Sequence, residues 1–70
     1  MSAEELIKLD GEIITKELLD EIEYEENVER VENIGNSGRY NGYTEYEIKF
    51  YFGSNLAGTM TITVYLKQGE

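Results

Sequence analysis

The chain has 70 residues and a formal net charge of -9, and it contains no cysteine, histidine or proline. A chain this short supports one hydrophobic core, so residues 1–70 form a single domain. The missing residue types exclude disulfides, thiol nucleophiles, the usual zinc sites and the usual general base. We therefore expect a non-enzymatic domain with no metal or cofactor, suited to a reducing cytoplasm.

The negative charge lies in the first 32 residues. Twelve of the fifteen acidic side chains but only three of the six basic ones are found there, and the remaining charges cancel. Nucleic acids and anionic membranes bind to clustered Lys and Arg, so we expect neither as a direct partner. The N-terminus lacks a signal-peptide pattern, and no apolar run approaches the roughly 18 residues of a membrane span. We expect a soluble, unprocessed protein.

The first element expected is a short helix. Ser2 and Glu5 have the spacing of a capping box, and Gly11 stands where such a helix would stop. Residues 6–9 before a tight turn also fit a short strand, so both alternatives stay open.

A clearer helix is predicted from Lys16 to about Glu25. Thr15 is a suitable N-cap, and Ile14 can pack on Leu19 as a hydrophobic staple. Apolar residues recur at helical spacing along this segment, which gives it one face to bury.

Three strands are predicted after this helix. Val28 to about Ile34 fits a bulged edge strand, and the glycine-rich segment Gly35–Gly42 predicts a loop. Tyr43–Phe52 alternates strictly and predicts the central strand of the sheet. A turn over residues 53–58 then leads to the last strand, Thr59–Lys67.

Residues of even number form the apolar face of both long strands, so even positions must pair with even positions. Pairing Phe52 with Met60 satisfies this rule and sets Glu45 opposite Lys67, an attractive pair. The alternative pairs Phe50 with Met60 and loses that ion pair. We prefer the first register.

The predicted fold class is α+β, with two N-terminal helices packed on one face of a three-stranded antiparallel meander. The glycines of the loop lack the lysine and the following helix of a phosphate-binding loop. The acidic residues near Asp10 lack the spacing of a calcium-binding loop. Neither segment predicts a ligand site.

The main candidate site is an acidic run that contains a single base, Arg30. Its carboxylates repel one another on a helix, and a plain solvated surface would mix in more lysine. The run therefore indicates a surface for a basic partner, although acidity also serves solubility. Its members are Glu17, Asp20, Glu21, Glu23, Glu25, Glu26, Glu29 and Glu32.

Tyrosines form the second candidate contact. Tyr51 and Tyr65 fall on the sheet face away from the helices, and Tyr40 and Tyr43 flank the glycine-rich loop. Exposed tyrosines are typical interface anchors. They give the alternative reading: a structural or homo-oligomerising domain, natural or designed, whose acidity serves only solubility.

In size, acidity, lack of cysteine and order of elements, the chain resembles the small acidic inhibitors of phages and mobile elements, such as anti-CRISPR and anti-restriction proteins. The resemblance implies a blocker whose carboxylates stand in for phosphates on a basic, nucleic-acid-binding surface of a partner such as a nuclease. It carries over no individual residue.

Overall fold

The computed structural model describes residues 2–52 and 58–69 and shows an α+β domain. Two short helices come first in the chain, with a very short strand between them, and three longer strands follow. The elements are α1 (Ala3–Lys8), β1 (Ile13–Ile14), α2 (Lys16–Glu23), β2 (Val28–Asn36), β3 (Tyr43–Phe52) and β4 (Gly58–Lys67).

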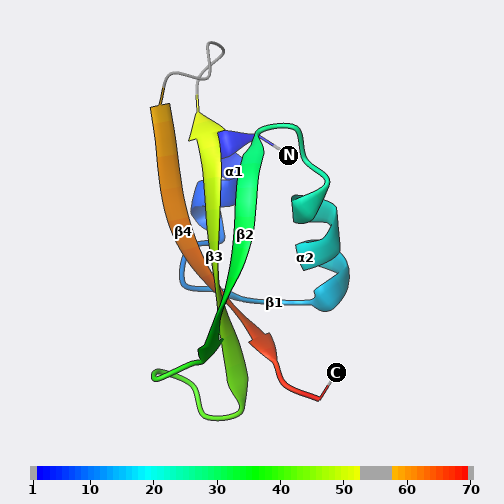
Figure 1. Cartoon of the computed structure of the whole chain (residues 1–70), viewed down its shortest axis with the longest axis vertical. Helices are drawn as coiled ribbons and strands as arrows, with labels where there is room; N and C mark the ends of the chain where they lie inside the picture. The colour runs from blue at the N-terminus through cyan, green and yellow to red at the C-terminus, as the bar shows by residue number, and fades with distance from the viewer. Residues whose placement is uncertain (1, 53–57, 70) are drawn as a thin grey trace.

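The strands form one four-stranded sheet in the order β1-β4-β3-β2 (Figure 1). The antiparallel meander β2-β3-β4 is present as predicted, but the expectation of only three strands was wrong. Ile13 and Ile14 add a fourth strand, parallel to β4, with Ile14 beside Leu66. Two residues are too few to show the alternation of polar and apolar residues that predicts a strand, so the sequence pattern could not predict β1.

Both helices begin at the predicted caps. The Ser2 hydroxyl accepts a hydrogen bond from the backbone N–H of Glu5, and the Glu5 side chain reaches back to Ser2, which confirms the capping box. The helical alternative for residues 6–9 is thereby favoured, with Leu9 as the C-cap. Gly11 follows with φ of 81°, a conformation that glycine adopts readily.

The second helix is two residues shorter than predicted. It ends at Glu23, and Tyr24 is its C-cap. The last turn contains no basic residue, and a longer helix would place Glu25 at the negative end of the helix dipole. The acidic composition itself therefore disfavours the extension.

The edge strand β2 is bulged, as predicted, but it extends to Asn36. Its pairing with β3 shifts twice, between Val28 and Arg30 and between Asn33 and Gly35. Gly35, predicted to lie in the loop, is part of the strand, where its φ of 111° fits the second irregularity.

The preferred register of β3 and β4 was wrong, and the alternative is the one observed. Phe50 lies opposite Met60, and Glu45 lies opposite Tyr65 rather than Lys67. The observed register pairs all ten residues of β3, from Tyr43 to Phe52, with β4. Two strands with these bounds would lose two pairs in the other register. An exposed ion pair is worth at most about 1 kcal/mol, which does not offset that loss.

The hydrophobic core lies between the helices and the even-numbered face of the sheet. Its fully buried side chains come from α1, α2, β3 and β4: Leu6, Ile22, Ile48, Phe50, Ile62 and Val64. Phe52 shares this face but is 46% exposed, and its ring lies against Gly58 on β4. The predicted turn spans residues 53–58, but Gly58 is the first residue of β4, and residues 53–57 lie outside the described residues. No helix in the described part of the chain is long and apolar enough to cross a membrane.

We predict that removing one methyl group from this core destabilises the domain measurably without unfolding it. Ile48→Val should lower the free energy of unfolding by about 0.5–1.5 kcal/mol, because Ile48 is fully buried. Ile34→Val is the matched control. Because Ile34 is 43% exposed, removing the same methyl group there should lower the free energy of unfolding by less than about 0.5 kcal/mol. Urea denaturation followed by circular dichroism measures both. Equal losses would contradict the assigned core.

Candidate functional site: an acidic ridge on the second helix

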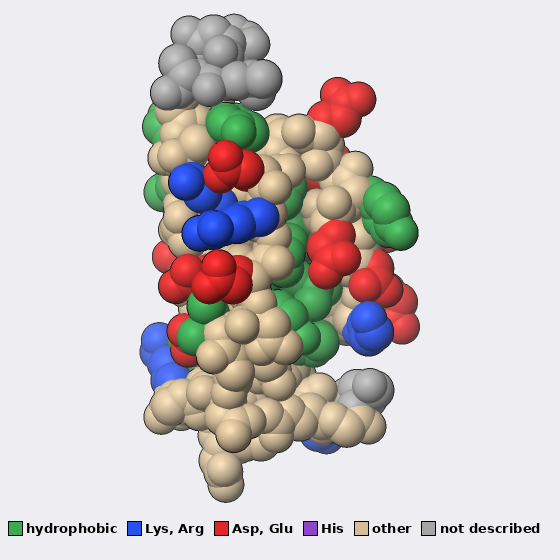
Figure 2. Space-filling view, viewed as in Figure 1, with side chains coloured by type: hydrophobic (Ala, Val, Ile, Leu, Met, Phe, Trp, Pro, Cys, Tyr) green, Lys and Arg blue, Asp and Glu red, His purple; other side chains and the backbone are tan. Residues whose placement is uncertain are grey.

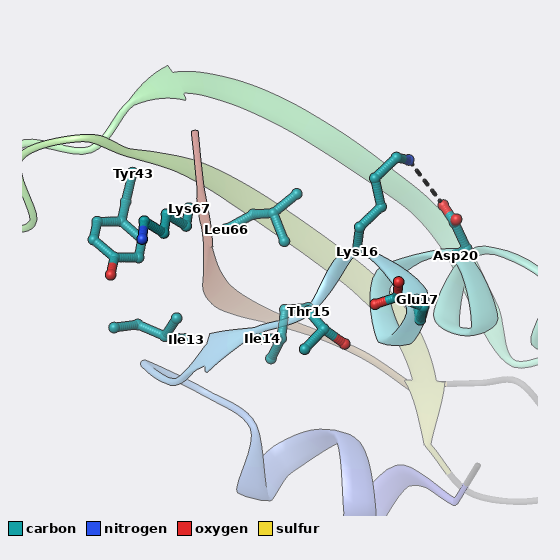
Figure 3. A pocket seen from close by; sticks show the side chains of 9 residues that line it. All are labelled: Ile13, Ile14, Thr15, Lys16, Glu17, Asp20, Tyr43, Leu66 and Lys67. Carbon is teal, nitrogen blue, oxygen red and sulfur yellow. Dashed lines mark hydrogen bonds and ion pairs between the residues drawn. The ribbon is translucent and has the colours of Figure 1, made fainter. Parts of the chain in front are cut away.

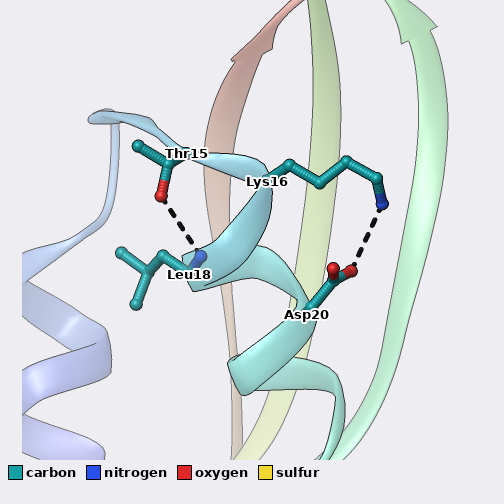
Figure 4. A network of polar contacts seen from close by, with 4 residues as sticks. All are labelled: Thr15, Lys16, Leu18 and Asp20. Atoms are coloured by element: carbon teal, nitrogen blue, oxygen red, sulfur yellow. Dashed lines mark hydrogen bonds and ion pairs between the residues drawn. The ribbon is translucent and has the colours of Figure 1, made fainter. Parts of the chain in front are cut away.

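Helix α2 is held in one orientation by its cap and by its apolar side. The hydroxyl of Thr15 accepts a hydrogen bond of 3.2 Å from the backbone N–H of Leu18 (Figure 4). Leu19 and Ile22 are buried in the core. Because these two side chains face the sheet, the opposite side of the helix faces solvent.

The solvent side of α2 carries four exposed carboxylates at spacings of three and four residues. We call them the acidic ridge: Glu17, Asp20, Glu21 and Glu23. Glu26, in the turn after the helix, is also exposed, whereas Glu25 is half-buried. Acidic side chains accordingly gather over α2 in the space-filling view (Figure 2). Six of the eight acids predicted as a binding run thus lie on this helix or directly after it.

The ridge has little neutralising charge. Lys16 forms an ion pair of 3.3 Å with Asp20, four residues along the helix, and both side chains are more than half exposed (Figure 4). Glu17, Glu21 and Glu23 form no ion pair with any residue in 2–52 or 58–69. Lys16 offsets one of the four carboxylates, so the ridge remains strongly negative.

The other two acids of the predicted run lie elsewhere, on the outer face of the sheet. Glu29 accepts a hydrogen bond of 3.1 Å from the Tyr51 hydroxyl and forms an ion pair of 3.3 Å with Lys49. Glu32 lies 3.7 Å from the guanidinium of Arg30. These carboxylates are paired with cations, so the run that is continuous in sequence is divided into two surfaces in the fold.

The polar contacts of Glu29 shift the pKa values of two groups. The hydrogen bond from Tyr51, followed by the one from Lys49, lowers the pKa of Glu29 below its ordinary value of 4.5. The same bond, together with the negative charge of Glu29, raises the pKa of Tyr51 above 10.0. The Tyr51 hydroxyl therefore remains a donor, already engaged within the sheet.

Tyr65 lies on the outer face, as the alternation predicts, but it is not exposed. The Tyr40 ring packs edge-on against it at 4.9 Å between ring centroids, and only 6% of Tyr65 remains accessible. The Tyr43 ring also packs edge-on against Tyr40, at 5.9 Å between ring centroids. The glycine-rich loop thus folds back and covers Tyr65, which the strand pattern alone does not reveal.

Sequence reasoning overlooked Tyr24. It is the most exposed large hydrophobic side chain among the described residues, at 88%, and it caps the helix directly after Glu23. Its position between glutamates was the available signal, since an aromatic residue beyond the last buried position of a helix has no core to enter. The structure therefore places an exposed aromatic ring at the end of the acidic ridge.

A groove of about 610 Å³ lies beside the start of α2 (Figure 3). It is bounded by the exposed Ile13, by Tyr43 and Leu66, and by the first turn of the helix, including Lys16 and Glu17. Cations, carboxylates and apolar groups are mixed along its walls, and their arrangement does not favour one class of ligand. We therefore assign it no ligand.

No group of three potential metal ligands occurs within the described residues. The chain matches no protein-family model, no curated protein and no solved structure.

We predict that Tyr51→Phe raises the pKa of Glu29 toward 4.5. The folded-state pKa is depressed, so ionised Glu29 stabilises the fold above the unfolded-state pKa, and this contribution is lost as the pH falls through the folded-state value. The variant should therefore lose less stability on acidification than the wild type. An NMR titration of the Glu29 carboxyl carbon measures the shift directly.

Tyr24→Phe is the control, because the Tyr24 ring is 88% exposed and the tyrosine hydroxyl that donates to Glu29 is that of Tyr51. It should leave the Glu29 titration unchanged. An unaltered titration in Tyr51→Phe would show that the hydrogen bond does not form in solution.

Proposed function

We propose that the chain is a non-enzymatic interaction module whose acidic ridge binds a Lys- and Arg-rich surface of a partner protein. The observation that carries the proposal is the concentration of exposed carboxylates on one side of α2, three of which have no ion-pair partner in the described chain. Repulsion between them opposes helix formation, and a basic partner would relieve it.

The spacing of these charges supports phosphate mimicry. Glu17 and Glu23 are six residues apart, which corresponds to about 9 Å along a helix. With Lys16 counted against Asp20, the helix carries a net three negative charges over this length, or one charge per roughly 3 Å. This is close to the roughly 3.4 Å per charge along one nucleic-acid strand. A partner surface built for a phosphate backbone would therefore meet a similar charge density.

The partner class that fits is a nucleic-acid-binding enzyme, such as a nuclease, in the same cytoplasmic compartment. By covering the backbone-binding surface of that enzyme, the ridge would inhibit it without performing any chemistry. This mode of action is also what the resemblance to anti-CRISPR and anti-restriction proteins implies.

Tyr24 gives the ridge an aromatic anchor. A ring that is 88% exposed loses much accessible area on contact, and its face attracts the guanidinium of an arginine. Carboxylates of the ridge, such as Glu21 and Glu23, can accept bidentate hydrogen bonds from the same kind of side chain. Arginine-rich surfaces are therefore favoured over lysine-rich ones.

The remaining predicted contact residues have lesser roles in this proposal. Glu29 and Glu32 are paired on the sheet, so they add to long-range attraction rather than to direct contacts. Tyr51 is engaged with Glu29, and Tyr65 is covered by Tyr40. The outer sheet face is thus the secondary surface.

We predict that reversing two charges of the ridge strongly weakens binding to a basic partner. Glu17→Lys combined with Glu21→Lys should weaken binding by at least about 100-fold, since charge pairs across an interface contribute roughly 1.5 kcal/mol or more each. Wild-type binding should also weaken steeply as salt rises from about 0.05 to about 0.5 M. Surface plasmon resonance against a panel of nucleases measures both effects.

The matched control is Glu32→Lys combined with Glu47→Lys. Both double variants replace two glutamates by lysines, so they change the net charge equally. Glu32 and Glu47 lie opposite each other on β2 and β3, so the control replaces one like-charge pair by another. The control should bind with less than a tenfold loss. Salt-insensitive binding, or equal losses in the two double variants, would refute the ridge as the contact surface.

A further inference from the structure

The outer edge of β4 is closed along its second half by the segment that precedes α2. Gly11 N–H donates to the carbonyl of Thr63 at 2.7 Å, and the Asp10 side chain accepts from Thr63 N–H at 3.0 Å. Tyr65 N–H donates to the carbonyl of Glu12 at 3.0 Å. The outward-facing backbone groups of Thr63 and Tyr65 are therefore satisfied within the chain.

The first half of the same edge is open. Outward-facing backbone groups occur at every second residue, so Thr59 and Thr61 present theirs on the same side as Thr63. Both residues are exposed, and no residue within 2–52 or 58–69 hydrogen-bonds to these groups. Each contributes one donor and one acceptor to an unpaired strand edge.

The opposite edge of the sheet is protected. Strand β2 has two irregularities in its pairing and carries Glu29, Arg30 and Glu32, features that disfavour pairing with another strand. The segment Gly58–Ile62 has no charge, and its pairing with β3 is regular. Within residues 2–52 and 58–69, the first half of β4 is therefore the open one of these two edge segments.

We propose that this edge pairs with the same edge of a second copy of the chain, in an antiparallel arrangement with a twofold axis at Met60. Thr59 then lies opposite Thr61 of the second copy, and the two exchange a pair of backbone hydrogen bonds, as does the symmetry-related pair. Centring the axis on Thr61 instead would engage Thr63, whose backbone groups are already bonded to Asp10 and Gly11. Cross-strand threonine pairs are favourable.

The side chains beside this edge suit the same arrangement. Met60 is 39% exposed on the helix side of the sheet and would meet the second copy's Met60 as a close, non-hydrogen-bonded pair. Gly58 would lie opposite the second copy's Ile62, and the Phe52 ring already covers Gly58. Apolar contact would therefore continue across the axis.

Charge also permits a second copy here, although each chain carries -9. The edge segment is neutral, and α2 with its acidic ridge lies on the other side of the molecule from the first half of β4 (Figure 1). At physiological salt, charges more than about 8 Å apart are largely screened. With β2 protected, the contact closes on itself, so the product is a dimer with two outward ridges rather than a fibre.

Cysteine crosslinking tests the proposed axis, because the chain has no other cysteine. In the Met60→Cys dimer, the Cα atoms of the two substituted residues would lie about 4.5 Å apart. This distance is within the range that a disulfide bridges. Mild oxidation should give a disulfide-linked dimer at least about tenfold faster than in the exposed control Tyr24→Cys, through the high effective concentration. Equal rates would overturn the proposal.

Sedimentation equilibrium of the cysteine-free chain provides the second test. Thr61→Pro removes an outward N–H that an edge strand does not need for its own fold, as circular dichroism would verify. It should raise the dimer dissociation constant at least about tenfold. A wild-type chain that stays monomeric at about millimolar concentration, or a folded Thr61→Pro variant that dimerises as the wild type does, would overturn the proposal. Neither test depends on the proposed basic partner.

Discussion

The pairing of β3 with β4 determines the arrangement of the rest of the molecule. It sets Ile48 beside Ile62 and Phe50 beside Met60, so the even-numbered side chains of both strands form one apolar face. Both helices bury their apolar residues against that face, which leaves the acidic side of α2 turned toward solvent. The position of the ridge is therefore a consequence of how the sheet is registered and covered.

The parts of the fold that depend on local chemistry could be predicted from the sequence. The caps at Ser2 and Thr15 and the bounds of β3 follow from side-chain hydrogen bonding and strict alternation. The register could not, because parity left two alternatives and the choice favoured an exposed ion pair of little value. β1 was missed because its pairing with β4 is a tertiary contact made by only two residues.

The candidate site was predictable as an acidic segment but not as a surface. A run in sequence does not show that Glu29 reaches Lys49 and Tyr51 while Glu21 faces solvent. In the same way, strand alternation predicted which face of the sheet carries Tyr65, but it could not predict that Tyr40, from the loop between β2 and β3, packs over this side chain. Exposure is decided by segments distant in sequence, and for this reason only the structure separates the ridge from the paired carboxylates.

The register of β3 and β4 determines which side chains of the core lie beside one another, and one NMR measurement tests it most directly. Glu47 and Thr63 lie opposite each other as a non-hydrogen-bonded pair, whose Cα atoms approach to about 4.5 Å in antiparallel sheets. The account predicts a strong Hα–Hα nuclear Overhauser effect between these two residues. A strong effect between Glu47 and Tyr65 instead would show the register shifted by two and would contradict it.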